Sequence, residues 1–205
     1  MAGIMYNNIP FDENDLSNPD TNFALGQFMT AWSQVESLCG FLFRNLSQIG
    51  YEIGNIIFDR VGAREQIEIL TELIHLMPNA EQRESASKAM KEVESLSRAR
   101  NKIVHAGWGL FNGEPARFWH GITNAHFDGI ATDTAQGKAD RERFIFTLPD
   151  IATLTGRSVS VRQTLESILQ ELKEKQRREQ LLQHARRLPN GDEWLRRQGI
   201  DPTQQ

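Results

Sequence analysis

The sequence predicts a mainly α-helical protein, an antiparallel bundle of four to five helices with a small β-hairpin insertion. Apolar residues recur every three to four positions over most of the chain, which is the period of helices with one buried face. Between residues 108 and 146 this period is lost, and short runs rich in aromatic and β-branched residues replace it. Short connections between the first three long periodic segments favour antiparallel packing.

The composition is that of a globular protein with one domain and some additions. The chain has 205 residues, of which 39% are hydrophobic and 24% charged. No run approaches the roughly 18 apolar residues of a membrane-spanning helix, and the N-terminus lacks the pattern of a secretory signal. The single cysteine, Cys39, excludes an internal disulfide framework and fits a reducing compartment. We therefore expect a cytoplasmic protein without membrane contact, with Cys39 as a buried thiol rather than a nucleophile.

The charge distribution argues against a protein that coats nucleic acid without selectivity. The formal net charge is −4, and residues 1–43 contain five acidic residues and no Lys or Arg. Residues 173–205 contain eight basic and five acidic residues, a net charge of +3. An RNA substrate would therefore have to bind at a local basic cleft.

The predicted organisation has three parts. Residues 1–18 lack a period and should form a flexible or loosely docked arm. A helical domain is expected over residues 19–175, with the hairpin inserted at about 112–147. Its helices are predicted from Pro19 to about residue 47, from Ala63 to Met77, from Ala80 to His105 and from Leu148 to Leu172, with a short helix or turn at Tyr51–Asp59.

The last part, residues 176–205, is predicted to be a charged helical extension. Its polar residues suit a solvated helix, and a nucleic-acid contact through its arginines is the alternative. Trp194 and Leu195 form a short amphipathic turn that is expected to dock on the domain or on a partner. In the insertion, strands are predicted at residues 116–122 and 141–147. His120 and His126 have no convincing ligand spacing, so we expect no metal site and no cofactor.

The most informative stretch ends the helix predicted over residues 80–105. It reads Arg98-Ala99-Arg100-Asn101-Lys102-Ile103-Val104-His105 and is followed by Gly107, which should cap the helix in a left-handed conformation. Cations are favoured at a helix C-terminus by about 0.3–1 kcal/mol each, but this does not explain the particular combination. Arg100 and His105 lie about 140° and about 7.5 Å apart on a helix, so both can border one shallow cleft. A guanidinium that binds phosphate and an imidazole that moves a proton suit a phosphodiester.

This stretch resembles the signature of HEPN domains, in which a polar residue follows an arginine directly and four to six residues in all separate the arginine from a histidine. Arg98 also fits the spacing, but Ala99 follows it where the family has a polar residue, so the motif is assigned to Arg100. The resemblance covers about residues 20–175 as architecture and is residue-specific only at 100–105. It implies a metal-independent endoribonuclease, in some members a toxin or phage-defence effector, although other members keep the fold without activity.

The resemblance also implies roles for single residues. Arg100, His105 and Asn101 would be catalytic, while Arg98 and Lys102 would bind the substrate. Some HEPN domains place an acidic residue of an early helix against the motif arginine, and Glu36 is the candidate here; the alternative is a surface glutamate. One histidine does not readily serve as both acid and base, and the family solution is a homodimer with two Arg/His sets in one cleft. The expected partners are RNA, a second copy of the chain, and a cognate antitoxin or regulatory protein.

Three hypotheses follow from the sequence. In the first, the protein cleaves RNA by attack of the 2′-hydroxyl on the adjacent phosphorus, with Arg100 on the phosphate and His105 moving a proton. In the second, it is a non-catalytic HEPN-like module that binds nucleotides or proteins. In the third, the motif is structural, with Arg100 paired to Glu36 inside the bundle and His105 capping helix carbonyls.

Overall fold

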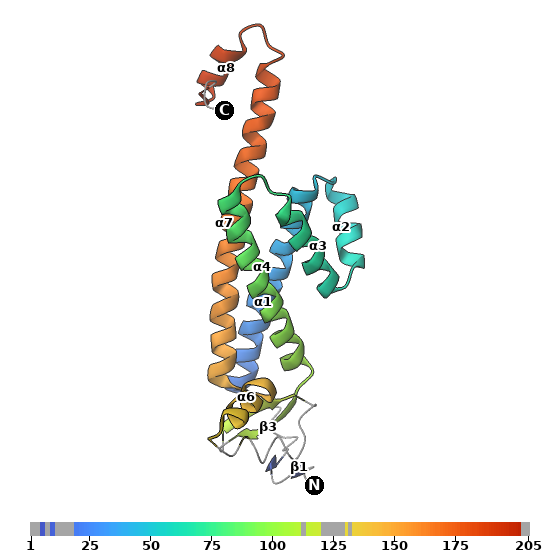
Figure 1. Cartoon of the computed structure of the whole chain (residues 1–205), viewed down its shortest axis with the longest axis vertical. Helices are drawn as coiled ribbons and strands as arrows, with labels where there is room; N and C mark the ends of the chain where they lie inside the picture. Colours follow the sequence, from blue (N-terminus) through green and yellow to red (C-terminus); the bar gives the residue numbers. More distant parts are fainter. Residues whose placement is uncertain are drawn as a thin grey trace.

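Four long helices build the body of the protein in the computed structural model, which describes residues 5–6, 9–10, 19–111, 114–119, 130 and 133–201. These helices are α1 (Pro19–Ser47), α3 (Ala63–His75), α4 (Ala80–Val104) and α7 (Leu148–Ala185). Helix α1 packs along α7, and α4 packs against both α7 and α3 (Figure 1). The predicted helical bundle is thus confirmed. None of the helices in the described part of the chain is long and apolar enough to cross a membrane.

The bundle core follows the apolar period of the sequence. Helix α1 buries Phe28, Trp32, Val35 and Leu42 against the other helices, and Cys39 lies in the same stripe with 6% of its surface exposed. Burial, with a smaller contribution from the negative charge of Glu36, raises the pKa of the Cys39 thiol to about 12. The expectation of a buried thiol is confirmed.

Local capping signals set the helix boundaries. The side chain of Asn79 accepts a hydrogen bond of 3.0 Å from the Gln82 amide, and α4 starts at Ala80, as predicted. At the start of α7, Thr147 and Asp150 form a capping box, with Pro149 in the first turn. The segment after α1 forms α2 (Tyr51–Arg60), so the short helix predicted there is present.

A small sheet lies at one end of the bundle. Strands β3 (Gly107–Phe111), β4 (Glu114–Phe118) and β5 (Ile145–Thr147) form an antiparallel sheet in the order β3-β4-β5. Helix α6 (Ala135–Phe144) runs directly into β5. The predicted pairing of the strands near residues 116 and 147 is therefore present, but residues 141–144 are helical rather than extended.

The start of the sheet corrects the expectation for Gly107. Helix α4 ends at Val104 with His105 as its C-cap, and Gly107 opens strand β3, where it pairs with Phe118. Two glycines after a helix favour a C-cap locally, but here the backbone pairs with a strand that follows in the chain, and the sequence alone does not show this pairing. His120 and His126 lie outside the described residues.

The two ends of the chain occupy opposite ends of the molecule (Figure 1). Strands β1 (Met5–Tyr6) and β2 (Ile9–Pro10) pair antiparallel, and β2 lies against β3; the remainder of the predicted N-terminal arm lies outside the described residues. At the other end, α7 continues without a break past residue 175, so the predicted extension begins as the last ten residues of this helix, 176–185. Helix α8 (Gly191–Arg197) folds back on α7 and buries Leu195, which places the predicted amphipathic turn on the chain itself.

Candidate functional site

The motif residues lie where α4 meets the sheet. His105 is the C-cap of α4, with φ −93° and ψ 4°, and its backbone N–H points to the carbonyls of Asn101 and Ile103. Its side chain is exposed and forms no hydrogen bond or ion pair with any described residue. The imidazole of His105 is therefore accessible from solvent.

Arg117 of strand β4, and not His105, caps the carbonyls at the end of α4. Its Nε and Nη2 donate to the Ile103 carbonyl at 3.1 and 2.5 Å, and Nη2 also donates to the Val104 carbonyl at 3.2 Å. Only 7% of Arg117 is exposed, and this burial lowers the pKa of its guanidinium. Sequence reasoning missed this residue, although a single cation between Ala116 and Phe118 in an apolar strand was a signal for it. Arg117 fixes the helix end on which His105 lies.

Arg100 is half-buried and carries an uncompensated charge. Its Nη1 donates to the Asn101 side-chain oxygen at 3.0 Å, while its Nε is buried without a hydrogen-bond partner. No carboxylate among the described residues forms an ion pair with it. A buried donor without a partner is costly in a structural role, and the binding of a ligand is one explanation for such a group.

Glu36 is not brought to the motif. It is exposed on α1 beside Cys39, and no ion pair joins its carboxylate to Arg100 within the described part of the chain. The structure therefore places Glu36 as a surface residue. The structural hypothesis for the motif loses both of its elements, because Arg117 also takes the capping role that it gave to His105.

Arg98 and Lys102, both predicted to bind substrate, lie on one wall of an open cleft. This basic cleft, between α4, α6 and α7, has a volume of about 840 Å³. Lys138 and Arg141 of α6 and Arg157 of α7 also line it, over a floor that includes Ile145, Phe146 and Leu154. Five cationic side chains from three helices therefore meet in one cleft.

Three of these five cations have carboxylate partners. Arg157 pairs with Glu92 at 2.6 Å, Lys138 with Asp133 at 2.9 Å and Arg98 with Glu94 at 3.2 Å. Lys102 and Arg141 have no ion-pair partner among the residues that the structure describes. Burial, and then the charges of Arg143 and Arg98, lower the pKa of Lys102. The carboxylates of Glu142 and Asp150 also line the cleft, so its lining holds five cations against two carboxylates. Since like charges in proximity cost energy, this excess of positive charge favours an anion.

The other face of α4 borders a hollow of different character. Asn101 and Arg98 line this hollow together with residues of α3, and its charged side chains include the acidic Glu68, Glu72 and Glu94. Arg100 and His105 line neither this hollow nor the basic cleft. Within one chain, the structure therefore brings Arg98 together with Lys102, and Arg100 with Asn101, but does not join Arg100 and His105 in one cleft.

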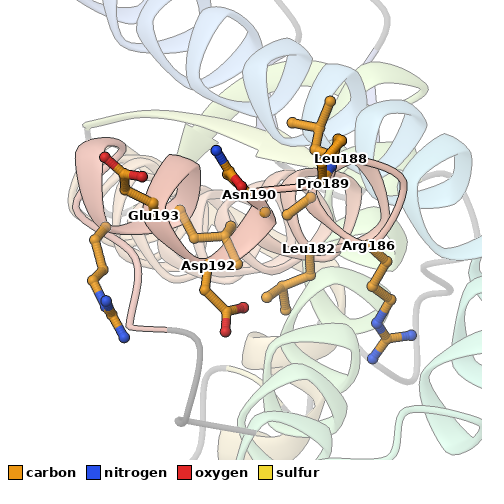
Figure 2. A pocket seen from close by; sticks show the side chains of 11 residues that line it. Leu182, Arg186, Leu188, Pro189, Asn190, Asp192 and Glu193 are labelled. Atoms are coloured by element: carbon orange, nitrogen blue, oxygen red, sulfur yellow. The ribbon is translucent and has the colours of Figure 1, made fainter.

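A further hollow lies at the tip formed by α7 and α8. Its lining mixes Arg186 and Arg196 with Asp192 and Glu193, and Figure 2 shows Arg186, Asp192 and Glu193 around the turn at Pro189 and Asn190. The opposite charges leave no excess for an anion there. Over the described residues, no group of three His, Cys, Asp or Glu side chains is placed to hold a metal ion.

Comparisons with known proteins add no functional assignment. No protein-family model matches the chain, and neither the curated proteins nor the solved structures give a significant match.

Proposed function

We propose that the protein is a metal-independent endoribonuclease of the HEPN type, with Arg100 and His105 as its catalytic residues. The observation that carries the proposal is that no structural role occupies these two side chains. Arg100 has a buried Nε without a partner and no ion pair within the described part of the chain, and the helix end beside His105 is capped by Arg117. A charge held without compensation in this way is a feature of sites that bind charged ligands.

The chemistry follows from the two side-chain types. Arg100 binds the scissile phosphate and stabilises the charge that develops on it. His105 takes the proton from the attacking 2′-hydroxyl or gives one to the leaving oxygen. Asn101, which accepts a hydrogen bond from Arg100, orients the guanidinium. The products carry a 2′,3′-cyclic phosphate, and DNA is not cut because it lacks the nucleophile.

A homodimer is part of the proposal. Arg100 and His105 lie on different sides of one helix end, so a single chain does not present both to one phosphate. A symmetric dimer along α4 brings a second Arg/His set to the same cleft and supplies separate groups for the acid and base steps. An activity of this kind in a cytoplasmic toxin or phage-defence effector requires restraint, by an antitoxin or a regulatory protein.

The same separation favours a second candidate function. If no dimer brings the two Arg/His sets together, the protein is a non-catalytic module that binds nucleotides or proteins through Arg100 and the basic cleft. This module differs from the enzyme in two respects that can be measured, because it forms no dimer cleft and replacing His105 removes no activity.

Cleavage of mixed cellular RNA in EDTA tests the proposal. We expect wild type to cut and both Arg100→Ala and His105→Ala to lose at least about 100-fold in rate, with cyclic-phosphate ends on the products. The controls are Arg64→Ala and His75→Ala, which replace exposed residues of the same types on α3 and should cut like wild type. Equal cleavage by all five proteins would assign the activity to another site or a contaminant. No cleavage by any of the five proteins, with a wild type that is monomeric, would favour the binding module.

A further inference from the structure

We infer that the basic cleft between α4, α6 and α7 holds the phosphates of a single RNA strand on one side of the scissile bond, with Lys102 and Arg141 as its principal contacts. The identity of the strand as RNA rests on the proposed function, whereas the anionic character of the ligand follows from the cleft itself.

The cations are arranged as two facing pairs. Arg98 and Lys102 are four residues apart on α4, and Lys138 and Arg141 are three apart on α6, so each pair lies on one face of its helix. Within each pair the side chains start about 5–6 Å apart, a scale that suits successive phosphates of an extended strand. A single free phosphate would use only a small part of a cleft of about 840 Å³.

The charge balance separates this cleft from an ordinary solvated surface. Its lining holds five cations against two carboxylates, those of Glu142 and Asp150. Asp150 is also engaged in the α7 cap, where it accepts from the Thr147 amide at 2.8 Å and the Thr147 hydroxyl at 2.6 Å. The Arg141 guanidinium lies 5.2 Å from the centre of the Phe111 ring, which orients it without neutralising it. A polyanion bound at Lys102 and Arg141 would relieve the repulsion of Lys102 by Arg143 and Arg98 and release counterions.

The direction of the cleft relates it to the motif. Arg98, Lys102 and His105 are spaced four and three residues apart, so they follow one face of α4 toward its end. A strand held by Arg98 and Lys102 therefore runs toward the exposed imidazole of His105. The strand is single, because in-line attack of a 2′-hydroxyl requires a backbone freedom that a paired A-form helix does not offer.

Binding is measured separately from cleavage with a probe that cannot react. The probe is a short fluorescein-labelled 2′-O-methyl oligonucleotide of mixed sequence, which keeps the phosphates but lacks the nucleophile, and the readout is fluorescence anisotropy with the full-length protein. We expect Lys102→Glu and Arg141→Glu each to weaken binding by at least about tenfold and to reduce the salt dependence. The matched control is Lys88→Glu on the same helix, an exposed lysine paired with Glu84 outside the cleft, which should change binding by less than about twofold.

Neutral variants keep the test valid if a charge reversal disturbs folding. Lys102→Met and Arg141→Met retain most of the side-chain volume, and each is expected to lower the slope of log affinity against log salt by about one. Thermal unfolding of every variant confirms that it is folded.

Three results would overturn the inference. They are the absence of probe binding by wild type, equal binding by wild type and the cleft variants, and equally tight binding of polyglutamate, which would identify an acidic protein as the ligand. The proposed function can fail separately. Probe binding that depends on the cleft, without any RNA cleavage, would contradict the ribonuclease activity and still support the cleft as a binding site. RNA cleavage at the wild-type rate in the cleft variants would overturn the inference about the cleft and leave the proposed function in place.

Discussion

The two ends of this molecule both carry many arginines, but they use them differently. At the sheet end, cations from α4, α6 and α7 converge on a concave surface, and Lys102 and Arg141 have no carboxylate partner among the described residues. At the α7–α8 tip, Arg186 and Arg196 share their hollow with Asp192 and Glu193, and Arg197 pairs with Glu193 at 2.6 Å on the exposed surface of one helix. Surface pairs of this kind stabilise by at most about 1 kcal/mol. The comparison shows that convergence of cations from different elements, rather than their number, marks a candidate anion site.

The largest effect that would break this comparison is expected at Arg117, because it builds the sheet end. Replacing it with Met removes the donors to the Ile103 and Val104 carbonyls, which are in a buried position. We expect the free energy of unfolding to fall by about 2–4 kcal/mol, as for other charged hydrogen bonds that are lost in the interior. Denaturant unfolding measures the loss, and amide exchange should accelerate first at the end of α4.

Arg143→Met is the matched control for Arg117→Met. Arg143 is exposed on α6, so its replacement should change the unfolding free energy by less than about 0.5 kcal/mol. If the two variants are equally stable, the hydrogen bonds of Arg117 do not stabilise the end of α4, and the sheet end has no stabilising contact that the α7–α8 tip lacks.

The second effect concerns the packing of α8 on α7 at the tip. Leu195 is 3% exposed where α8 folds back on α7, so Leu195→Ala should cost about 2–3 kcal/mol of local stability and release α8. Amide exchange in α8 should therefore increase, while binding of the 2′-O-methyl oligonucleotide stays at the wild-type level. The control, Arg196→Ala, replaces an exposed residue of the same helix. A loss of binding in Leu195→Ala without a change in the cleft would place the anion site at the tip.

Much of the fold was predictable because its signals are local. The apolar period predicted α1, α3 and α4, and the start of α7 was predicted at Leu148, where the structure has it. The polar run after Leu172 was predicted to be a solvated helix, and α7 continues through it because residues such as Lys, Glu, Gln and Arg are good helix formers.

The parts that sequence reasoning missed depend on contacts between distant segments. Gly107 favours a helix cap by itself, but its backbone pairs with Phe118 in the sheet. The role of Arg117 requires that β4 lie beside the end of α4. For the site, Arg98 and Lys102 were predicted from the motif, whereas Lys138 and Arg141 were not. Residue 138 fell between the two predicted strands and residues 141–147 were expected to be extended, so the helix α6 that carries both side chains was not predicted.

The smallest effect concerns the titration of Lys102, whose pKa burial and the charges of Arg143 and Arg98 lower from the ordinary 10.5. A lysine with a lowered folded-state pKa carries its full penalty below that pKa, and the penalty is relieved as the pH rises from it toward 10.5. Wild type should therefore gain stability relative to Lys102→Met over this alkaline window, measured by urea unfolding at about pH 8 and about pH 10. Oligonucleotide binding favours the charged form, so its affinity should fall with pH over the same window in wild type but not in Lys102→Met. Lys88→Met is the control. If the stability difference between wild type and Lys102→Met does not change with pH, Lys102 is solvated like any surface lysine, and the crowding of cations that distinguishes the sheet end from the tip is absent.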